Sequence, residues 1–168
     1  MKNIKFLSAI AILTLGITMG AAAQTTASIT LQGTIPAILK IVVTPEPGIS
    51  SLDLTRDLNS KIATAVEISN KRAGYTVTVS SANAKAAGTD APFFKGVASD
   101  NTDTLPYTIS YGGSAATFSG GIATVSTASA KTSAAGSSKD VVLNYNGTSL
   151  FPNEDTYNDT LTFTITAN

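Results

Sequence analysis

Short stretches in which apolar and polar residues alternate one by one are the feature that most limits what this chain can fold into. A period of two is typical of a strand with one buried and one solvent-facing side, and does not fit a helix. Alternation is clear at 61–69 and 75–81, a β-branched run predicts a further strand at 37–44, and strand signals return at 105–113, 116–127 and 140–147. The last segment is the most regular: a row of threonines falls on one face, and the other carries Tyr157, Asp159, Leu161, Phe163, Ile165 and Ala167.

Turn residues separate these segments at the spacing that is common in antiparallel sandwiches. The sequence therefore predicts an all-β, immunoglobulin-like antiparallel β-sandwich. Residues 61–69 and 75–81, joined by "NKRAG", predict a hairpin, and Gly120-Gly121 predicts a tight turn. Residues 82–104 and 128–139 are expected to be long connections, the first with enough alanine for a short helix before Gly88.

The first residues predict export from the cytoplasm. Lys2 and Lys5 precede an apolar run that reaches about Met19, and small residues follow at Ala21 and Ala23. This order is typical of a secretory signal peptide over residues 1–23, cleaved after Ala23. A membrane anchor fits less well, because the run is short and is interrupted by polar residues. No later stretch is long enough to span a bilayer, so we expect no stable membrane insertion.

The composition argues against several classes of function. The chain has no cysteine and no histidine, so disulfides and the commonest general base and metal ligand are excluded. Without the two lysines of the signal peptide, the 11 basic residues fall to nine against 11 acidic ones, a net charge of −2. This balance does not favour nucleic acid as a partner. No nucleophile motif or phosphate-binding loop occurs, and we expect neither enzymatic activity nor a cofactor.

Two acidic loops, residues 99–104 and 153–159, are the only candidates for a metal site. Their carboxylates and amides are oxygen ligands of the kind that calcium takes. The first loop lacks the glycine and the closing bidentate glutamate of an EF-hand. Asp and Asn also form turns readily, and this simpler explanation leads us to expect no metal.

The segment that follows the predicted signal peptide is itself an amphipathic strand. Within residues 24–35 the alternating positions are Ala27, Ile29, Leu31, Gly33 and Ile35. Each large apolar side chain would contribute about 1.5–3 kcal/mol if it were fully buried. Such a strand needs cover, either from its own domain or from a neighbouring molecule.

Taken together, these features resemble the subunits of chaperone-usher pili, or fimbriae. The stretches that carry the resemblance are "ITLQGTIP", "IATAVEISNKRAGYTVTVSS", "LPYTISYGG" and "TYNDTLTFTITAN". Because the chain has no cysteine, it is more similar to the alternate, colonisation-factor class. The spore-coat-U-like archaic pilins are the second choice, since they usually carry a disulfide.

The resemblance implies an incomplete sandwich over residues 36–168 that is completed by the N-terminal extension of the next subunit. The donor-strand residues would then be Ala27, Ile29, Leu31, Gly33 and Ile35, with Gly33 where the acceptor is too narrow for a side chain. The groove-edge strand would present Leu161, Phe163, Ile165 and Ala167. The implied partners are neighbouring copies or related subunits, a periplasmic chaperone and an outer-membrane usher. The implied location is the periplasm in transit and then a cell-surface fimbria, as a shaft subunit that supports adhesion.

A second interpretation stays open on the sequence alone. The chain could be a self-complete secreted β-sandwich, in which residues 25–36 pair within their own domain. It would then bind a glycan or a host surface through Tyr107, Tyr111, Tyr145 or the Phe93-Phe94 loop.

Overall fold

The computed structural model describes residues 25–168, so the predicted signal peptide lies outside the described residues. The chain divides into two units, an N-terminal one that ends at Thr34 and a compact one, Ile35–Asn168. Across residues 25–168, no helix has the length and apolar character needed to cross a membrane.

The compact unit is built almost entirely from strands, as the alternating pattern predicts. The elements in chain order are β1 (Leu39–Pro45), β2 (Asp57–Ser69), β3 (Tyr75–Ser81), α1 (Ala82–Ala87), β4 (Phe93–Gly96), β5 (Thr104–Tyr111), β6 (Ser114–Ala115), β7 (Ile122–Ala128), β8 (Ser137–Asn146), β9 (Tyr157–Asn158) and β10 (Leu161–Ala167). All the ladders between these strands are antiparallel. The predicted all-β antiparallel sandwich is confirmed.

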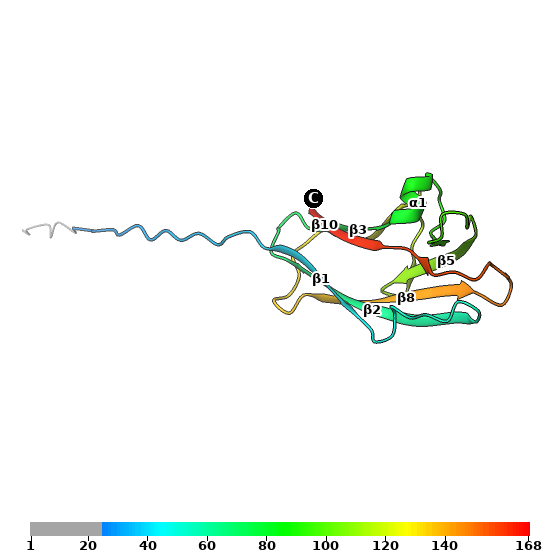
Figure 1. The fold of residues 1–168 in the computed structure, drawn as a ribbon. Helices are drawn as coiled ribbons and strands as arrows, with labels where there is room; N and C mark the ends of the chain where they lie inside the picture. The colour runs from blue at the N-terminus through cyan, green and yellow to red at the C-terminus, as the bar shows by residue number, and fades with distance from the viewer. Residues whose placement is uncertain (1–24) are drawn as a thin grey trace, which may run out of the picture. The chain divides into compact units, whose positions relative to one another are not determined.

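The strands form two sheets that enclose one core (Figure 1). The larger sheet has the order β1-β2-β8-β5-β4-β9, with β6 paired to β5. The smaller sheet has the order β10-β3-β7. Figure 1 shows β10 and β3 in one layer and β1, β2 and β8 in the other. The chain therefore changes sheet five times: between β2 and β3, β3 and β4, β6 and β7, β7 and β8, and β9 and β10.

The predicted hairpin between residues 61–69 and 75–81 is wrong. β2 pairs with β1 and β8, whereas β3 pairs with β10 and β7. β2 from Ala63 onward and the whole of β3 bury one face, including Ala65 on β2 and Val77 on β3. These two faces form opposite walls of the core, so the strands stack across the sandwich instead of pairing side by side. Gly74 makes the crossing, with φ of +89°, and a Cβ there would collide with the carbonyl oxygen of Ala128.

Local turn chemistry is predicted more accurately than strand partners. Ser119 and Ile122 exchange two main-chain hydrogen bonds, of 2.8 and 3.2 Å, around Gly120-Gly121, which confirms the tight turn. The expected short helix is α1, whose first turn is capped by the Ser81 side chain. The Phe93-Phe94 stretch, expected as an apolar point within a connection, forms β4.

Candidate functional site

The strand β10 lies at an edge of the smaller sheet and leaves part of the core open. In the part of the chain that the structure describes, it pairs with β3 alone, from Leu161↔Ser81 to Ala167↔Tyr75. Its core-facing side chains Leu161, Phe163 and Ile165 are only half-buried, and Ala167 is exposed. The matching positions on β3 are nearly or completely buried, with Val77 and Val79 at 0% exposure. Cover is therefore missing on the β10 side of the core.

β1 forms the corresponding edge of the larger sheet. Among the described residues it pairs only with β2, and its core-facing side chains Leu39, Ile41 and Val43 are half-buried. β1 lies close to β10, but no ladder joins the two strands. We call these two strands, with the six half-buried side chains, the β1/β10 edge. Within residues 25–168, both sheets end here with strands whose outer main-chain groups lack a strand partner.

The main chain of β1 directs alternate residues towards β2. Asn70 N–H donates to the Ile38 carbonyl at 3.1 Å, and Glu46 N–H donates to the Ile62 carbonyl at 2.8 Å. Because such bonds alternate along an antiparallel pair, the main-chain groups of Leu39, Ile41 and Val43 point the other way. The residues that face the open core thus also carry the main-chain donors and acceptors of the open edge.

The residues predicted to act as a donor strand are exposed. Ile29, Leu31 and Ile35 have exposed fractions of 87%, 92% and 86%. No strand is assigned to residues 25–38, and Ala27 and Gly33 are likewise exposed. The predicted groove-edge residues, by contrast, lie on one strand, with Leu161, Phe163 and Ile165 on its core face.

Asp159 fixes the point where the chain crosses from β9 to β10. Its Oδ2 accepts hydrogen bonds from the Ser81 and Tyr107 hydroxyls, both at 2.5 Å. Its Oδ1 accepts from the main-chain N–H of Asn83 at 3.0 Å and of Thr160 at 2.7 Å. Burial, together with the bond to Asp159, raises the pKa of Tyr107. The start of β10 is therefore attached to both sheets at once.

Glu67 makes a second polar link between the sheets. This β2 residue is completely buried and accepts hydrogen bonds from the hydroxyls of Tyr75 and Tyr111, both at 2.8 Å. Burial, and then the Glu67 carboxylate, raise the pKa of Tyr75 to about 12. The Tyr111 ring lies 6.1 Å from the Phe163 ring, centroid to centroid. This link therefore reaches the core face of β10.

Sequence reasoning missed the roles of both acids, although each gave a signal. Asp159 is in phase with the apolar face of the last segment, and Glu67 is in phase with Ala63 and Ala65. A carboxylate on the face that must be buried requires hydrogen-bond donors inside the protein. The tyrosines that supply them come from strands distant in the sequence.

The acidic loops use their carboxylates for main-chain contacts. Asp155 Oδ2 accepts from Ala98 N–H and from Asn101 Nδ2, each at 2.9 Å, and these bonds lower its pKa. Asp103 accepts from Asn153 N–H at 2.7 Å. Within residues 25–168, no group of acidic side chains is placed to hold a metal ion. The contacts are those of ordered turns.

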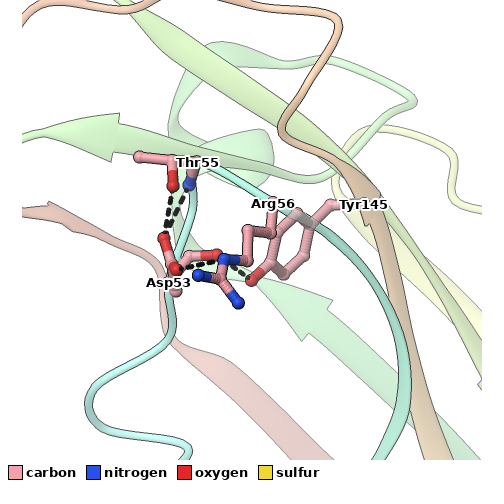
Figure 2. A network of polar contacts seen from close by, with 4 residues as sticks. All are labelled: Asp53, Thr55, Arg56 and Tyr145. Atoms are coloured by element: carbon pink, nitrogen blue, oxygen red, sulfur yellow. Dashed lines mark hydrogen bonds and ion pairs between the residues drawn. The ribbon is translucent and has the colours of Figure 1, made fainter.

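A polar network at another loop has a similar structural role. Figure 2 shows Asp53 accepting from Thr55 through both its hydroxyl, at 2.6 Å, and its N–H, at 3.1 Å. Arg56 Nε lies 3.0 Å from the other Asp53 oxygen, and the Tyr145 hydroxyl donates to the Asp53 carbonyl at 3.0 Å. The bonds from Thr55 are the main reason that the pKa of Asp53 is lowered. The network ties the β1–β2 connection to β8.

The three tyrosines offered for a recognition surface are parts of the core, and Phe94 packs against it, whereas Phe93 is half-buried outside it. Tyr107, Tyr111 and Tyr145 are 4%, 2% and 3% exposed. Phe94 is half-buried, with its ring 4.8 Å from that of Tyr107 and 5.9 Å from that of Tyr145. The three tyrosines cannot form a ligand-binding surface in this fold.

Comparison with known protein families finds no matching family, and comparison with curated proteins finds no match. The functional argument therefore depends on the geometry of the β1/β10 edge and of residues 25–35.

Proposed function

We propose that this chain is the structural subunit of a cell-surface fimbria, assembled by donor-strand complementation. In this proposal, residues 25–35 of one copy insert along the β1/β10 edge of the next. The contact is head to tail and does not close on itself, so it generates a filament. One observation carries the proposal: the same chain has an open edge on its core and an exposed apolar strand sequence that could cover it.

The two parts match in length and in period. Leu161, Phe163 and Ile165 project inward at every second residue of β10, and Leu39, Ile41 and Val43 do so on β1. The exposed side chains at 29, 31 and 35 follow the same period of two, with Gly33 between them. A strand in this position would gain hydrogen bonds at one or both edges and bury its apolar face in the core. Burial would contribute about 1.5–3 kcal/mol for each large side chain.

The free edge also accounts for the assembly partners that the resemblance implies. An unpaired strand edge beside exposed apolar side chains promotes aggregation before assembly. A periplasmic chaperone would cover the β1/β10 edge in transit, and an outer-membrane usher would exchange the chaperone for the next subunit. This route requires the signal peptide predicted for residues 1–23.

The test compares the mature chain, Gln24–Asn168, with a variant that carries a copy of residues 25–36 after Asn168 through a short linker. A strand following β10 in this way would lie antiparallel to it along the open edge. We expect the mature chain to polymerise or aggregate, and the fused chain to be a monomer with a much higher melting temperature. The matched control carries the same fusion with Asp at the copied positions of Ile29 and Leu31.

Two outcomes would contradict the proposal. The first is a mature chain that is already a stable monomer and gains nothing from the fused copy. The second is a control fusion that stabilises the domain as well as the unchanged copy does. Either result would favour the self-complete binding module.

A further inference from the structure

Asn70 uses its side chain to lengthen the ladder between β1 and β2. Ile38 N–H donates to Asn70 Oδ1 at 2.7 Å, while Asn70 N–H donates to the Ile38 carbonyl at 3.1 Å. The side-chain oxygen thus takes the place that a main-chain carbonyl has in a regular rung. Asn70 Nδ2 then donates to the Pro36 carbonyl at 2.8 Å. One side chain therefore fixes Pro36 and Ile38 ahead of the first residue of β1.

The contacts of Asn70 with Pro36 and Ile38 affect where residues 25–35, which we call the donor segment, can lie. Only residues 36–38 separate residues 25–35 from β1, so residues 25–35 could reach the β1/β10 edge of their own subunit only through a reversal just before β1. If residues 25–35 folded back in this way, they would pair with the β1/β10 edge of the same molecule, and polymerisation would stop. The proposed fibre requires the opposite result, because the segment must remain free for a second copy.

Pro36 disfavours two of the possible turns before β1, those over residues 33–36 and 34–37. A four-residue turn over 33–36 would be closed by the N–H of its last residue, and proline has none. A turn over 34–37 would place Ile35 and Pro36 at its centre. The turns that suit two-residue hairpins require a positive φ at the first central residue, which a β-branched side chain resists.

Asn70 acts against the two later reversals. A turn over 35–38 would be closed by the N–H of Ile38, which is already donated to Asn70. A turn over 36–39 would place Ile38 at its centre and reorient it, which would break the two bonds that join Ile38 to Asn70. In a reversal earlier in the chain, Leu31, Gly33 or Ile35 would become turn residues. They would then no longer be part of the inserted strand.

We infer that Asn70 is a positioning residue that keeps the donor segment out of its own subunit and so makes it available to a second copy. This inference rests on the proposed function. It predicts that loss of the Asn70 side chain shifts strand insertion from between molecules to within one molecule. The domain should remain folded, because the contacts of Asn70 with residues 36–38 lie at the outer end of β1.

The experiment uses disulfide trapping, which is simple here because the chain has no cysteine. Thr30→Cys and Thr164→Cys place thiols near the middle of the donor segment and of β10, on the face away from the core. Neighbouring strands bring Cα atoms within the range that a disulfide spans. Mild oxidation followed by a non-reducing gel then separates linked ladders from internally linked monomers.

With Asn70 intact, we expect a ladder of linked chains and little internal link. In Asn70→Ala we expect the internally linked fraction to rise at least fivefold. Asn70→Asp keeps the acceptor for Ile38 N–H but loses the donor to Pro36, and should lie between the two. The matched control is Asn144→Ala, which removes an exposed amide from β8, and it should behave as the unchanged chain does.

The outcomes separate this inference from the proposed function. An unchanged ladder in Asn70→Ala would overturn the role of Asn70 and leave the fibre subunit standing. An internal link that already dominates with Asn70 intact would overturn the role of Asn70 and show a self-complete sandwich. The lack of any link in all variants would overturn both. If a thermal melt shows that Asn70→Ala is unfolded, the internally linked fraction of Asn70→Asp on the same non-reducing gel decides in its place.

Discussion

Tyr107 on β5 donates its hydroxyl hydrogen to Asp159 at 2.5 Å, at the point where the chain leaves the larger sheet to begin β10. The same carboxylate oxygen accepts from Ser81 at the end of β3. The strand that carries Phe163 therefore starts from a fixed point, and its open edge is held in place before any partner arrives.

The first prediction concerns this link. Asp159→Ala removes the acceptor of four hydrogen bonds and leaves the buried Tyr107 hydroxyl without a partner. We expect the free energy of unfolding to fall by about 2–4 kcal/mol, since bonds to a charged group are each worth about 1.5–3 kcal/mol and are not additive. Urea unfolding of the fused monomer, with and without the substitution, measures this change. Tyr107→Phe removes only one of the four bonds and should lower the free energy of unfolding by less than Asp159→Ala does. A larger loss in Tyr107→Phe would contradict the role assigned to Asp159.

The second prediction concerns alkaline pH. The folded chain raises the pKa of Tyr75 to about 12, above its value of about 10 in an unfolded chain, and burial raises that of Tyr111 in the same direction. The unfolded state therefore loses protons first, so stability is fully present below pH 10 and falls as the pH rises towards 12. Thermal melts across this range measure the fall.

The matched variant for this prediction is Tyr75→Phe. It removes one of the titrating groups beside Glu67, so its stability should decline less steeply between pH 10 and 12. An identical slope in the two proteins would show that Tyr75 does not contribute to the decline.

The third prediction concerns the apolar face of the donor segment. Leu31 is 92% exposed, so Leu31→Asp should leave the domain intact and act only when the segment is inserted. Loss of one buried leucine corresponds to about 1.5–3 kcal/mol, and we expect polymerisation to weaken at least tenfold. Light scattering against protein concentration measures the effect. Thr30→Asp places the same charge on the opposite face of the strand, and an equal loss in that variant would contradict a face-specific insertion.

The fourth prediction concerns Gly33. Apart from the two adjacent residues, no described residue has an atom within 4 Å of a Cβ placed at Gly33, so Gly33→Leu should not disturb the subunit before assembly. In the fibre, Gly33 is expected to occupy a narrow place beside the core, and a leucine there should reduce polymerisation strongly. The measurement is again light scattering, with Thr34→Leu as the control for added bulk. Polymerisation of Gly33→Leu at the unchanged rate would show that the acceptor has room for a side chain.

The strands and turns depend on short-range patterns, and the sequence predicted most of them. The threonine row opposite Leu161, Phe163 and Ile165 indicates a strand with one buried face, and β10 occupies that segment. Gly120-Gly121 indicates a tight turn because glycine adopts a positive φ without a steric cost. The donor segment differs, because its alternation predicts a strand whereas no strand is assigned to residues 25–38, and its insertion into a neighbour stays a prediction.

Other features were decided only by the tertiary structure, because they depend on which strands meet across the core. The short link between β2 and β3 suggested a hairpin, yet both strands bury a face and so lie in opposite sheets. The partners of Glu67, Asp159 and Asn70 are far away in the sequence or depend on the ladder register, which no local pattern specifies. Alternation along a strand says which side chains must be buried, while the packing of the two sheets determines what buries them. The open edge beside β10 is visible only once that packing is known.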